Sequence, residues 1–309
     1  MKKKMEFRED GTFTILQFSD LHWTNDNESD MKSHDLMNDI INEQNPDFII
    51  FTGDVIHVED CPSPENSFIK ATSAVINSGV PWAFVFGNHD AIIKETYLEL
   101  LDIQEKLPNC LTERGLDNIS GYGNYVLKIH SHNSDRTVAA LYCMDSGTYA
   151  PEKIGGADWI KHDQINWFIN ESKSLLSEIG SVIPSLAFFH IPLPEYREIW
   201  NKNICFGSKY EKVGSAKLNS GLFNAFVGMN NIIGAFVGHD HINDYCGDLN
   251  GVKLCYGRAT GYNTYGKEGF LRGARIIRMF EGERTFESFI RLDDGSIISK
   301  QQEHHPISE

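Results

Sequence analysis

The feature that most constrains this chain is a set of five short apolar runs, each ending in a polar cluster that contains histidine, aspartate or asparagine. The runs are FTILQF (13–18), DFIIFT (47–52), PWAFVF (81–86), SLAFF (185–189) and IIGAFV (232–237). Continuous apolar runs of this length are typical of strands that are covered on both faces. Longer segments with helical spacing lie between them, so the sequence predicts βαβ units and an at least partly parallel sheet.

Three segments carry the helical pattern, at 30–44, 65–79 and 162–180. The apolar stripes of the first two consist of Met31, Leu36, Met37, Ile40 and Ile41, and of Phe68, Ala71, Val75 and Ile76. The last two segments end at glycines, Gly79 and Gly180, which are typical of helix C-caps. We also expect neighbouring strands within 121–130 and 136–145, and a β-hairpin from 273–280 and 283–292.

No linker, repeat or low-complexity tract divides the 309 residues. We therefore expect a single domain over 1–309, with a core of about 12–292 and tails at 1–10 and 296–309 in which His304 and His305 are solvated. The lysine-rich start runs directly into charged residues without an apolar signal segment, and no run approaches the roughly 18 apolar residues of a membrane helix. These observations predict a cytoplasmic protein.

The formal net charge of −15 argues against a protein that binds duplex nucleic acid, because such a protein needs a basic face. It leaves a small phosphorylated substrate open, since bound cations can reverse the local sign of the charge. The six cysteines are scattered and form no CxxC pair, which favours a reducing compartment. Cys246 and Cys255 are close enough in sequence to bridge a hairpin; we expect two reduced thiols, with a disulfide as the alternative.

The polar clusters supply a set of metal-competent side chains. Ligands of open α/β sheets gather beyond the carboxyl ends of the strands, so we expect the five clusters to share one rim. Glycines at 53, 87 and 238 would let the backbone turn sharply there. Oxygen and imidazole donors without thiolates suit Mn²⁺, Fe or Zn²⁺, and seven donors fit two ions that share a carboxylate. The candidates are Asp20, His22, Asp54, Asn88, His190, His239 and His241.

The order of these blocks, D-x-H, GD, GNH[DE], H and GHxH, resembles that of the calcineurin-like metallophosphoesterase superfamily. The stretches FGNHD, FFHIPLPEY, LNSGLF, GHDHINDYCG and LCYGRATGYNTYGK are similar to the Dcr2 and purple-acid-phosphatase-29-like branch, over roughly residues 12 to 280. The resemblance implies a four-layer α/β/β/α sandwich with mixed sheets. It also implies a phosphoesterase that depends on a dinuclear metal centre.

The resemblance assigns roles to individual residues. A first ion would be held by Asp20, His22 and His241, a second by Asn88, His190 and His239, and Asp54 would bridge the two. A metal-bridging hydroxide would attack the phosphorus, and His89 would assist the leaving group. Asp90 would orient the His89 ring or cap the loop, and Arg258 and Tyr262 would either line the substrate pocket or pack.

One block departs from the pattern of true purple acid phosphatases, whose GDxxY block supplies a tyrosinate ligand. Here the block reads GDVIH, so His57 stands in the tyrosine's place and we expect no tyrosinate-to-iron colour. For His57 we expect a position at the surface or in support of the metal ligands. Asp240 and Asp244 are expected to fix the local turn or to hold a ligand histidine.

The sequence leaves the ester class open. The alternatives are a phosphodiesterase for cyclic nucleotides or other small diesters, and a catalytically silent metal-binding interaction module on the same fold. A dinuclear peptidase or amidohydrolase ranks below these, because such enzymes lack the GNH block. The stretch GYNTYGKE (261–268) resembles a nucleotide P-loop, but Glu268 stands where that loop needs Ser or Thr, so we reject a nucleotide P-loop.

Overall fold

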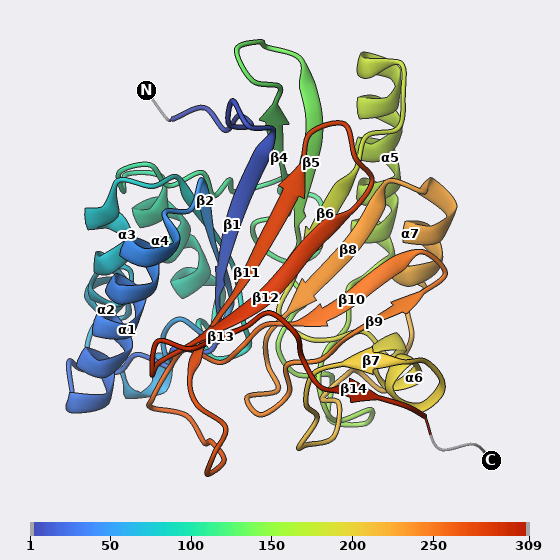
Figure 1. The fold of residues 1–309 in the computed structure, drawn as a ribbon. Helices are drawn as coiled ribbons and strands as arrows, with labels where there is room; N and C mark the ends of the chain where they lie inside the picture. The colour runs from blue at the N-terminus through green and yellow to red at the C-terminus, as the bar shows by residue number, and fades with distance from the viewer. Residues whose placement is uncertain (1–2, 307–309) are drawn as a thin grey trace.

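Two mixed sheets packed face to face form the centre of the molecule in a computed structural model that describes residues 3–306 (Figure 1). The six-stranded sheet has the order β13 (Ile297–Ile298), β12 (Phe286–Leu292), β11 (Gly273–Phe280), β1 (Thr12–Phe18), β2 (Phe48–Thr52) and β3 (Trp82–Val85). The eight-stranded sheet has the order β14 (Glu303–His304), β7 (Cys205–Phe206), β9 (Cys246–Leu249), β10 (Val252–Tyr256), β8 (Ile232–Val237), β6 (Ser185–Phe188), β5 (Thr137–Cys143) and β4 (Tyr125–His130).

Helices cover the outer face of each sheet (Figure 1). On the six-stranded sheet lie α1 (Glu28–Gln44), α2 (Pro64–Ala71), α3 (Ser73–Ser78) and α4 (Lys94–Gln104). On the eight-stranded sheet lie α5 (His162–Ile179), α6 (Glu195–Lys202) and α7 (Leu222–Met229), and a short 3₁₀ helix covers Val58–Asp60. The expected four-layer α/β/β/α sandwich is confirmed.

The core consists of three clusters, one for each interface between the four layers. On β1, Phe13 and Ile15 pack between the two sheets, whereas Leu16 and Phe18 face the helices of the first outer layer. Side chains of a strand alternate between its two faces, so a strand that is covered on both sides needs apolar residues throughout. This is why the runs read as continuous apolar stretches.

All five predicted runs form strands, but they divide between the two sheets. Strands β1, β2 and β3 are parallel neighbours in one sheet, and β6 and β8 are parallel neighbours in the other. The carboxyl ends of these strands therefore meet across two adjacent sheets instead of along the rim of one. The predicted β4–β5 neighbours and the β11–β12 hairpin are confirmed as antiparallel pairs.

Two details of the helices differ from the prediction. The segment 65–79 breaks at Thr72, which is both the C-cap of α2 and the N-cap of α3, and its hydroxyl donates to the Phe68 carbonyl (2.7 Å). Met31 is 44% exposed and does not join the buried stripe of α1. The buried residue of that first turn is Asp30, whose carboxylate caps the helix by accepting the Asn27 N–H (3.0 Å).

The structure also corrects the expectation of reduced thiols at Cys246 and Cys255. These residues lie directly opposite each other on β9 and β10 and form a disulfide. Among residues 3–306, no helix combines the length and the apolar character that crossing a membrane requires.

The segments expected as tails make specific contacts. Glu6 bridges to His130 at the end of β4, and the C-terminal segment adds β13 to one sheet and β14 to the other. His304, expected to be solvated, is half-buried because its ring stacks on Trp200 at a centroid distance of 3.7 Å. The outer ends of both predicted tails, residues 1–2 and 307–309, lie outside the described residues.

Candidate metal centre

The polar clusters after β1, β2, β3, β6 and β8 converge on one point, which brings all seven predicted donors together. Four of them hold a left-handed backbone, with φ of 56° at Asp20, 48° at His22, 52° at Asp54 and 74° at His239. Non-glycine residues in this region cost on the order of 1–3 kcal/mol each and persist where the surrounding fold imposes them. The fold thus accepts backbone strain at four residues, which follow β1, β2 and β8, and turns their side chains toward a common centre.

The glycines beside these donors serve two different purposes. Gly53 has a left-handed φ of 88°, as a sharp turn requires. Gly87 and Gly238 lie outside the left-handed region, and a side chain on either would collide with the carboxylate of Asp54 or Asp20. At these two positions the absence of a side chain provides space for the donors rather than a sharp turn.

The first donor group consists of Asp20, His22, Asp54 and His241. The His22 Nε2 atom lies 3.3 Å from His241 Nε2 and 3.5 Å from Asp54 Oδ2, and His241 Nε2 lies 3.4 Å from Asp20 Oδ1. All four side chains are buried. Two carboxylates and two imidazoles at this spacing form a site that a first-row divalent cation can occupy.

The second donor group consists of Asp54, Asn88, His190 and His239. The His190 Nε2 atom lies 3.1 Å from Asp54 Oδ2, 3.1 Å from Asn88 Oδ1 and 3.2 Å from His239 Nδ1. The Asn88 amide nitrogen donates to the Tyr149 hydroxyl (3.2 Å), which directs the amide oxygen toward the centre. Asp54 Oδ2 contacts a histidine of each group, so this single oxygen belongs to both.

His190 shows that the second group suits a cation. Its Nδ1–H donates to the Thr52 carbonyl (2.8 Å), so in the neutral imidazole Nε2 carries the lone pair. That lone pair faces two oxygens, of Asp54 and Asn88, which can only accept hydrogen bonds. Burial acts to lower the pKa of His190, but the Asp54 charge raises it to about 10. In the metal-free protein, His190 Nε2 therefore carries a proton between the oxygens of Asp54 and Asn88.

Four other donors are held in the protonation states that metal binding needs. Burial lowers the pKa of His22 to about 4 and that of His239 to about 3, so both rings are neutral at pH 7. Burial acts to raise the pKa of Asp20, yet the hydrogen bond and the charge of His241 lower it to about 2. For Asp54 the charge of His190 likewise outweighs burial and holds the pKa well below its usual range.

Asp90 braces the loops that carry the donors. Its buried carboxylate accepts the backbone N–H groups of Gly87 (2.7 Å), Asp54 (2.8 Å) and Ile56 (3.0 Å). Burial and the nearby Asp54 charge raise its pKa to about 7. Within residues 3–306 it forms no hydrogen bond to the His89 ring. These contacts favour the loop-capping alternative over direct orientation of that ring.

His89 and His57 lie beside the centre without joining either donor group. The half-buried His89 ring lies 5.1 Å from the His22 ring and 4.8 Å from the His57 ring, centroid to centroid. His89 also lines a pocket of about 280 Å³ together with Asn88, Ile92 and Tyr149. His57 Nδ1 pairs with Asp60 at 2.7 Å, in agreement with the expected position at the edge of the site.

Arg258 and Tyr262 are engaged in contacts away from the donors. The buried Arg258 pairs with Asp244 (2.5 Å) and stacks on the Phe270 ring. The Tyr262 hydroxyl donates to Asp293 (2.6 Å). Both sets of contacts favour the packing alternative. Asp240 also fixes local structure as expected, because its carboxylate accepts the Gly214 N–H (3.0 Å).

Three residues near the centre were not predicted individually. The Thr264 hydroxyl contacts His241 Nδ1, and the Tyr265 ring lies 4.3 Å from the His241 ring. Both belong to the GYNTYGKE stretch that resembles a P-loop, which is a loop here beside the second histidine of GHDH. Tyr149, which holds the Asn88 amide, lies in a loop whose sequence gives no comparable signal.

A family model for calcineurin-like phosphoesterases matches residues 13–243, which contain every donor of both groups. The chain belongs to this family. It is 36% identical to "Probable inactive purple acid phosphatase 29" of Arabidopsis thaliana, over 97% of this chain and 88% of that protein. It is 31% identical to "Phosphatase DCR2" of Saccharomyces cerevisiae, over 94% of this chain but only 55% of the yeast protein.

Solved structures confirm the calcineurin-like phosphoesterase fold. A dimetal phosphatase from Danio rerio superposes with a TM-score of 0.59 at 13% identity, covering 89% of this chain and 98% of that one. GAP50, described as the anchor in the inner membrane complex of Plasmodium, superposes with a TM-score of 0.54, also at 13% identity, covering 96% of this chain and 90% of that one. At such identities the likeness concerns the fold alone.

Proposed function

We propose that this calcineurin-like phosphoesterase hydrolyses a small phosphate ester with two metal ions. The observation that carries the proposal is the position of Asp54 Oδ2, 3.5 Å from His22 Nε2 in the first donor group and 3.1 Å from His190 Nε2 in the second. A carboxylate oxygen shared by two sets of buried donors is the arrangement that a two-metal centre needs. The metals proposed are Mn, Fe or Zn, since no donor is a thiolate.

Asp20, His22 and His241 would hold one ion, Asn88, His190 and His239 the other, and Asp54 both. Bound ions of this kind neutralise phosphoryl oxygens and lower the pKa of water. The chain's own residues fix the geometry: Asp90 ties the Asp54 and Gly87 backbones together, and Thr52 fixes the tautomer of His190. Donors held in this way lose little entropy when a substrate binds.

His89 is proposed to act on the leaving group. Its backbone N–H is fixed by Asp54 Oδ1 (2.8 Å), while its ring stays half-exposed beside the pocket that Ile92 and Tyr149 line. A ring in this position can donate a proton to a departing oxygen or stabilise the charge that develops on it. Burial lowers the pKa of His89 in the metal-free protein.

A second candidate is a catalytically silent metal-binding module. It is favoured by the names of the plant relatives, which describe purple acid phosphatases 29, 28 and 14 as probably inactive. The donors of this chain argue for activity instead, because the bridging aspartate, both GHDH histidines and the GNH histidine are all present. A cyclic or other small diester remains the alternative substrate class.

The test is elemental analysis of the purified protein combined with hydrolysis assays. The protein would be stripped with a chelator, reloaded with Mn²⁺, Fe or Zn²⁺, and assayed with p-nitrophenyl phosphate and bis-p-nitrophenyl phosphate. About two metals per chain and metal-dependent release support the enzyme, and the preferred ester distinguishes a monoesterase from a diesterase. Two bound metals without hydrolysis of either ester would favour the silent module, and absence of bound metal would overturn both.

A further inference from the structure

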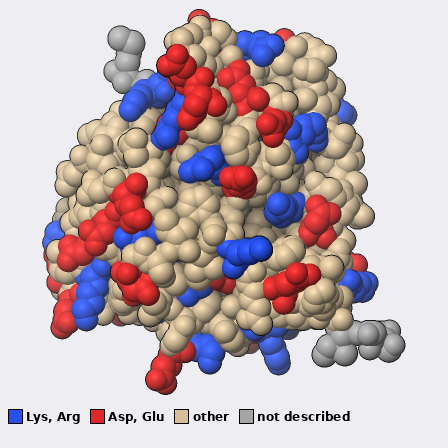
Figure 2. All heavy atoms as spheres, in the orientation of Figure 1, with Lys and Arg blue, Asp and Glu red and all other residues tan. Residues whose placement is uncertain are grey.

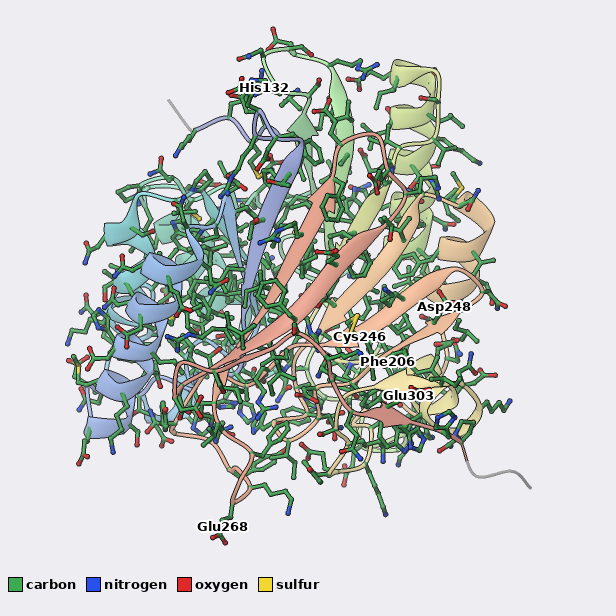
Figure 3. The ribbon with its side chains drawn as sticks, in the orientation of Figure 1. His132, Phe206, Cys246, Asp248, Glu268 and Glu303 are labelled. Carbon is green, nitrogen blue, oxygen red and sulfur yellow. A yellow bond between two sulfur atoms is a disulfide. The ribbon has the colours of Figure 1, made fainter. Side chains whose placement is uncertain are left out.

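A groove of about 830 Å³ lies on the face shown in Figures 2 and 3, apart from both donor groups. One wall is formed by β7 and β9, and the opposite wall by the segment 299–303 that leads into β14. Figure 3 shows Phe206, Cys246, Asp248 and Glu303 gathered in this part of the molecule. None of the predicted metal, catalytic or substrate residues lines the groove.

Basic side chains outnumber acidic ones in the groove, although the protein carries a net charge of −15. Its cations are Lys202, Lys253, Lys300 and Arg275, and its only carboxylates are Asp248 and Glu303. Both carboxylates are engaged elsewhere: Asp248 accepts the Gly251 N–H (3.2 Å), and Glu303 pairs with His305 (3.0 Å). Figure 2 shows basic side chains over the middle and lower right of this face.

Three of the four cations form no ion pair with a carboxylate among residues 3–306. Lys202 pairs with Glu198, but Lys253 lies over the Phe286 ring, and Lys300 forms no ion pair or hydrogen bond with any described residue. An uncompensated positive charge in a concave site attracts an anion, because low-dielectric walls focus its field.

Arg275, on β11 at the floor of the groove, is the most informative of these cations. Its side chain is fully buried, yet it donates only to the carbonyls of Tyr256 and Asp244 and to the Ser288 hydroxyl. A guanidinium has five N–H donors, so two remain without a partner among the described residues. The charge of Asp244 acts to raise the pKa of Arg275, but the carboxylate of Asp244 is paired with Arg258 (2.5 Å). Ser288, which accepts from Arg275, also lines the groove.

The wall beside these charges is apolar. Ile204 and Phe206 are 46% and 48% exposed, and both line the groove with Cys246 of the disulfide. Pockets for small organic ligands combine apolar surface with a few polar groups that fix the orientation. Here the apolar wall and the cationic floor are adjacent.

We propose that this groove binds a small organic anion, with the negatively charged group facing Lys253 and Lys300 near the buried Arg275 and a flat apolar body against Phe206 and Ile204. The site is separate from the phosphoesterase centre and does not depend on the function proposed for that centre. A carboxylate, a sulfonate or a phosphate has the charge and the acceptor oxygens that the floor requires.

The experiment compares two fluorescent probes of the same shape on the full chain. The anion is 8-anilinonaphthalene-1-sulfonate, and N-phenyl-1-naphthylamine is its neutral counterpart. We expect the anion to bind one-to-one, and a Lys253→Glu/Lys300→Glu double variant to weaken it at least tenfold while changing the neutral probe by less than twofold. Lys173→Glu is the matched control, since Lys173 is an exposed lysine of α5 without an ion pair to any described residue.

Further variants separate the charge from the apolar wall. Phe206→Ser should weaken both probes, and circular dichroism melting would show that each variant folds. The proposal is overturned if the double variant binds the anion as tightly as the parent chain, which would place the probe elsewhere. It is also overturned if both probes lose affinity equally in the double variant, because the groove would then select apolar character alone, or if neither probe saturates.

Discussion

The two donor groups share Asp54 but differ in charge and in backbone. The first group has two carboxylates, Asp20 and Asp54, and three of its four residues are left-handed. In the second group Asp54 is the only carboxylate, and Asn88 and His190 have no left-handed backbone. The fold therefore builds one site with a formal charge of −2 and another with −1. A divalent cation is attracted more strongly by the first, so the two positions should fill in sequence.

The largest effect is expected from removing what the two groups share. Asp54→Asn should lower the metal affinity of both groups. It should also reduce turnover by more than the roughly 10²–10⁴-fold of a positioned acid, because both ions assist the same displacement. Metal content and p-nitrophenyl phosphate hydrolysis would be measured together, with Asp35→Asn, an exposed carboxylate on α1, as the control. Two tightly bound metals in Asp54→Asn would show that the groups are independent sites.

The next effect tests whether a residue outside both groups assists the reaction. His89→Asn should keep two metals per chain and lower turnover by about 10²–10⁴-fold, the range of a positioned acid. The loss should be smaller for an ester whose leaving group is more acidic, since such a group needs less protonation. A variant with unchanged turnover would remove His89 from the reaction.

The difference between the groups can be measured by titrating chelator-treated protein with Mn²⁺ in a calorimeter. We expect two steps of unequal affinity. Asp20→Asn should weaken the tighter step, and His239→Gln the weaker one, each by at least about 10–100-fold. Substituting residues that only support metal ligands already lowers metal affinity by this factor. Two equal steps in the parent chain, or the same step weakened by both substitutions, would contradict the asymmetry.

The smallest effect is expected at His57. Its ring lies 5.8 Å from that of His22, and its ion pair with Asp60 is partly exposed, which makes the pair worth about 0–1 kcal/mol. His57→Phe should change metal content and turnover by less than about threefold. His57→Tyr tests whether a side chain at position 57 can reach the metal. A visible charge-transfer colour with Fe would show that a tyrosinate at this position binds the ion.

Local sequence predicted much of the fold, because strands and helices of this kind are encoded in short patterns. The five runs became β1, β2, β3, β6 and β8, and the polar residues after each became the donors. The break at Thr72 was missed since the apolar spacing continues across it. The disulfide depended on the register of β9 and β10, which sequence distance does not give.

The sequence by itself determined the composition of the candidate metal centre: the identity of the seven candidate donors, the lack of a thiolate among them, and a glycine beside several of them. Only the tertiary structure decided how they combine. The strands divide between two sheets, and Asp54 shares one oxygen between the two groups. Asp90 binds the amides of Asp54 and Ile56, which are distant from it in sequence. The cationic groove was also invisible in the sequence, because β7, β9, β11 and the C-terminal segment approach one another only through long-range packing. Periodicity reports which face of an element is buried, but not which distant element covers it.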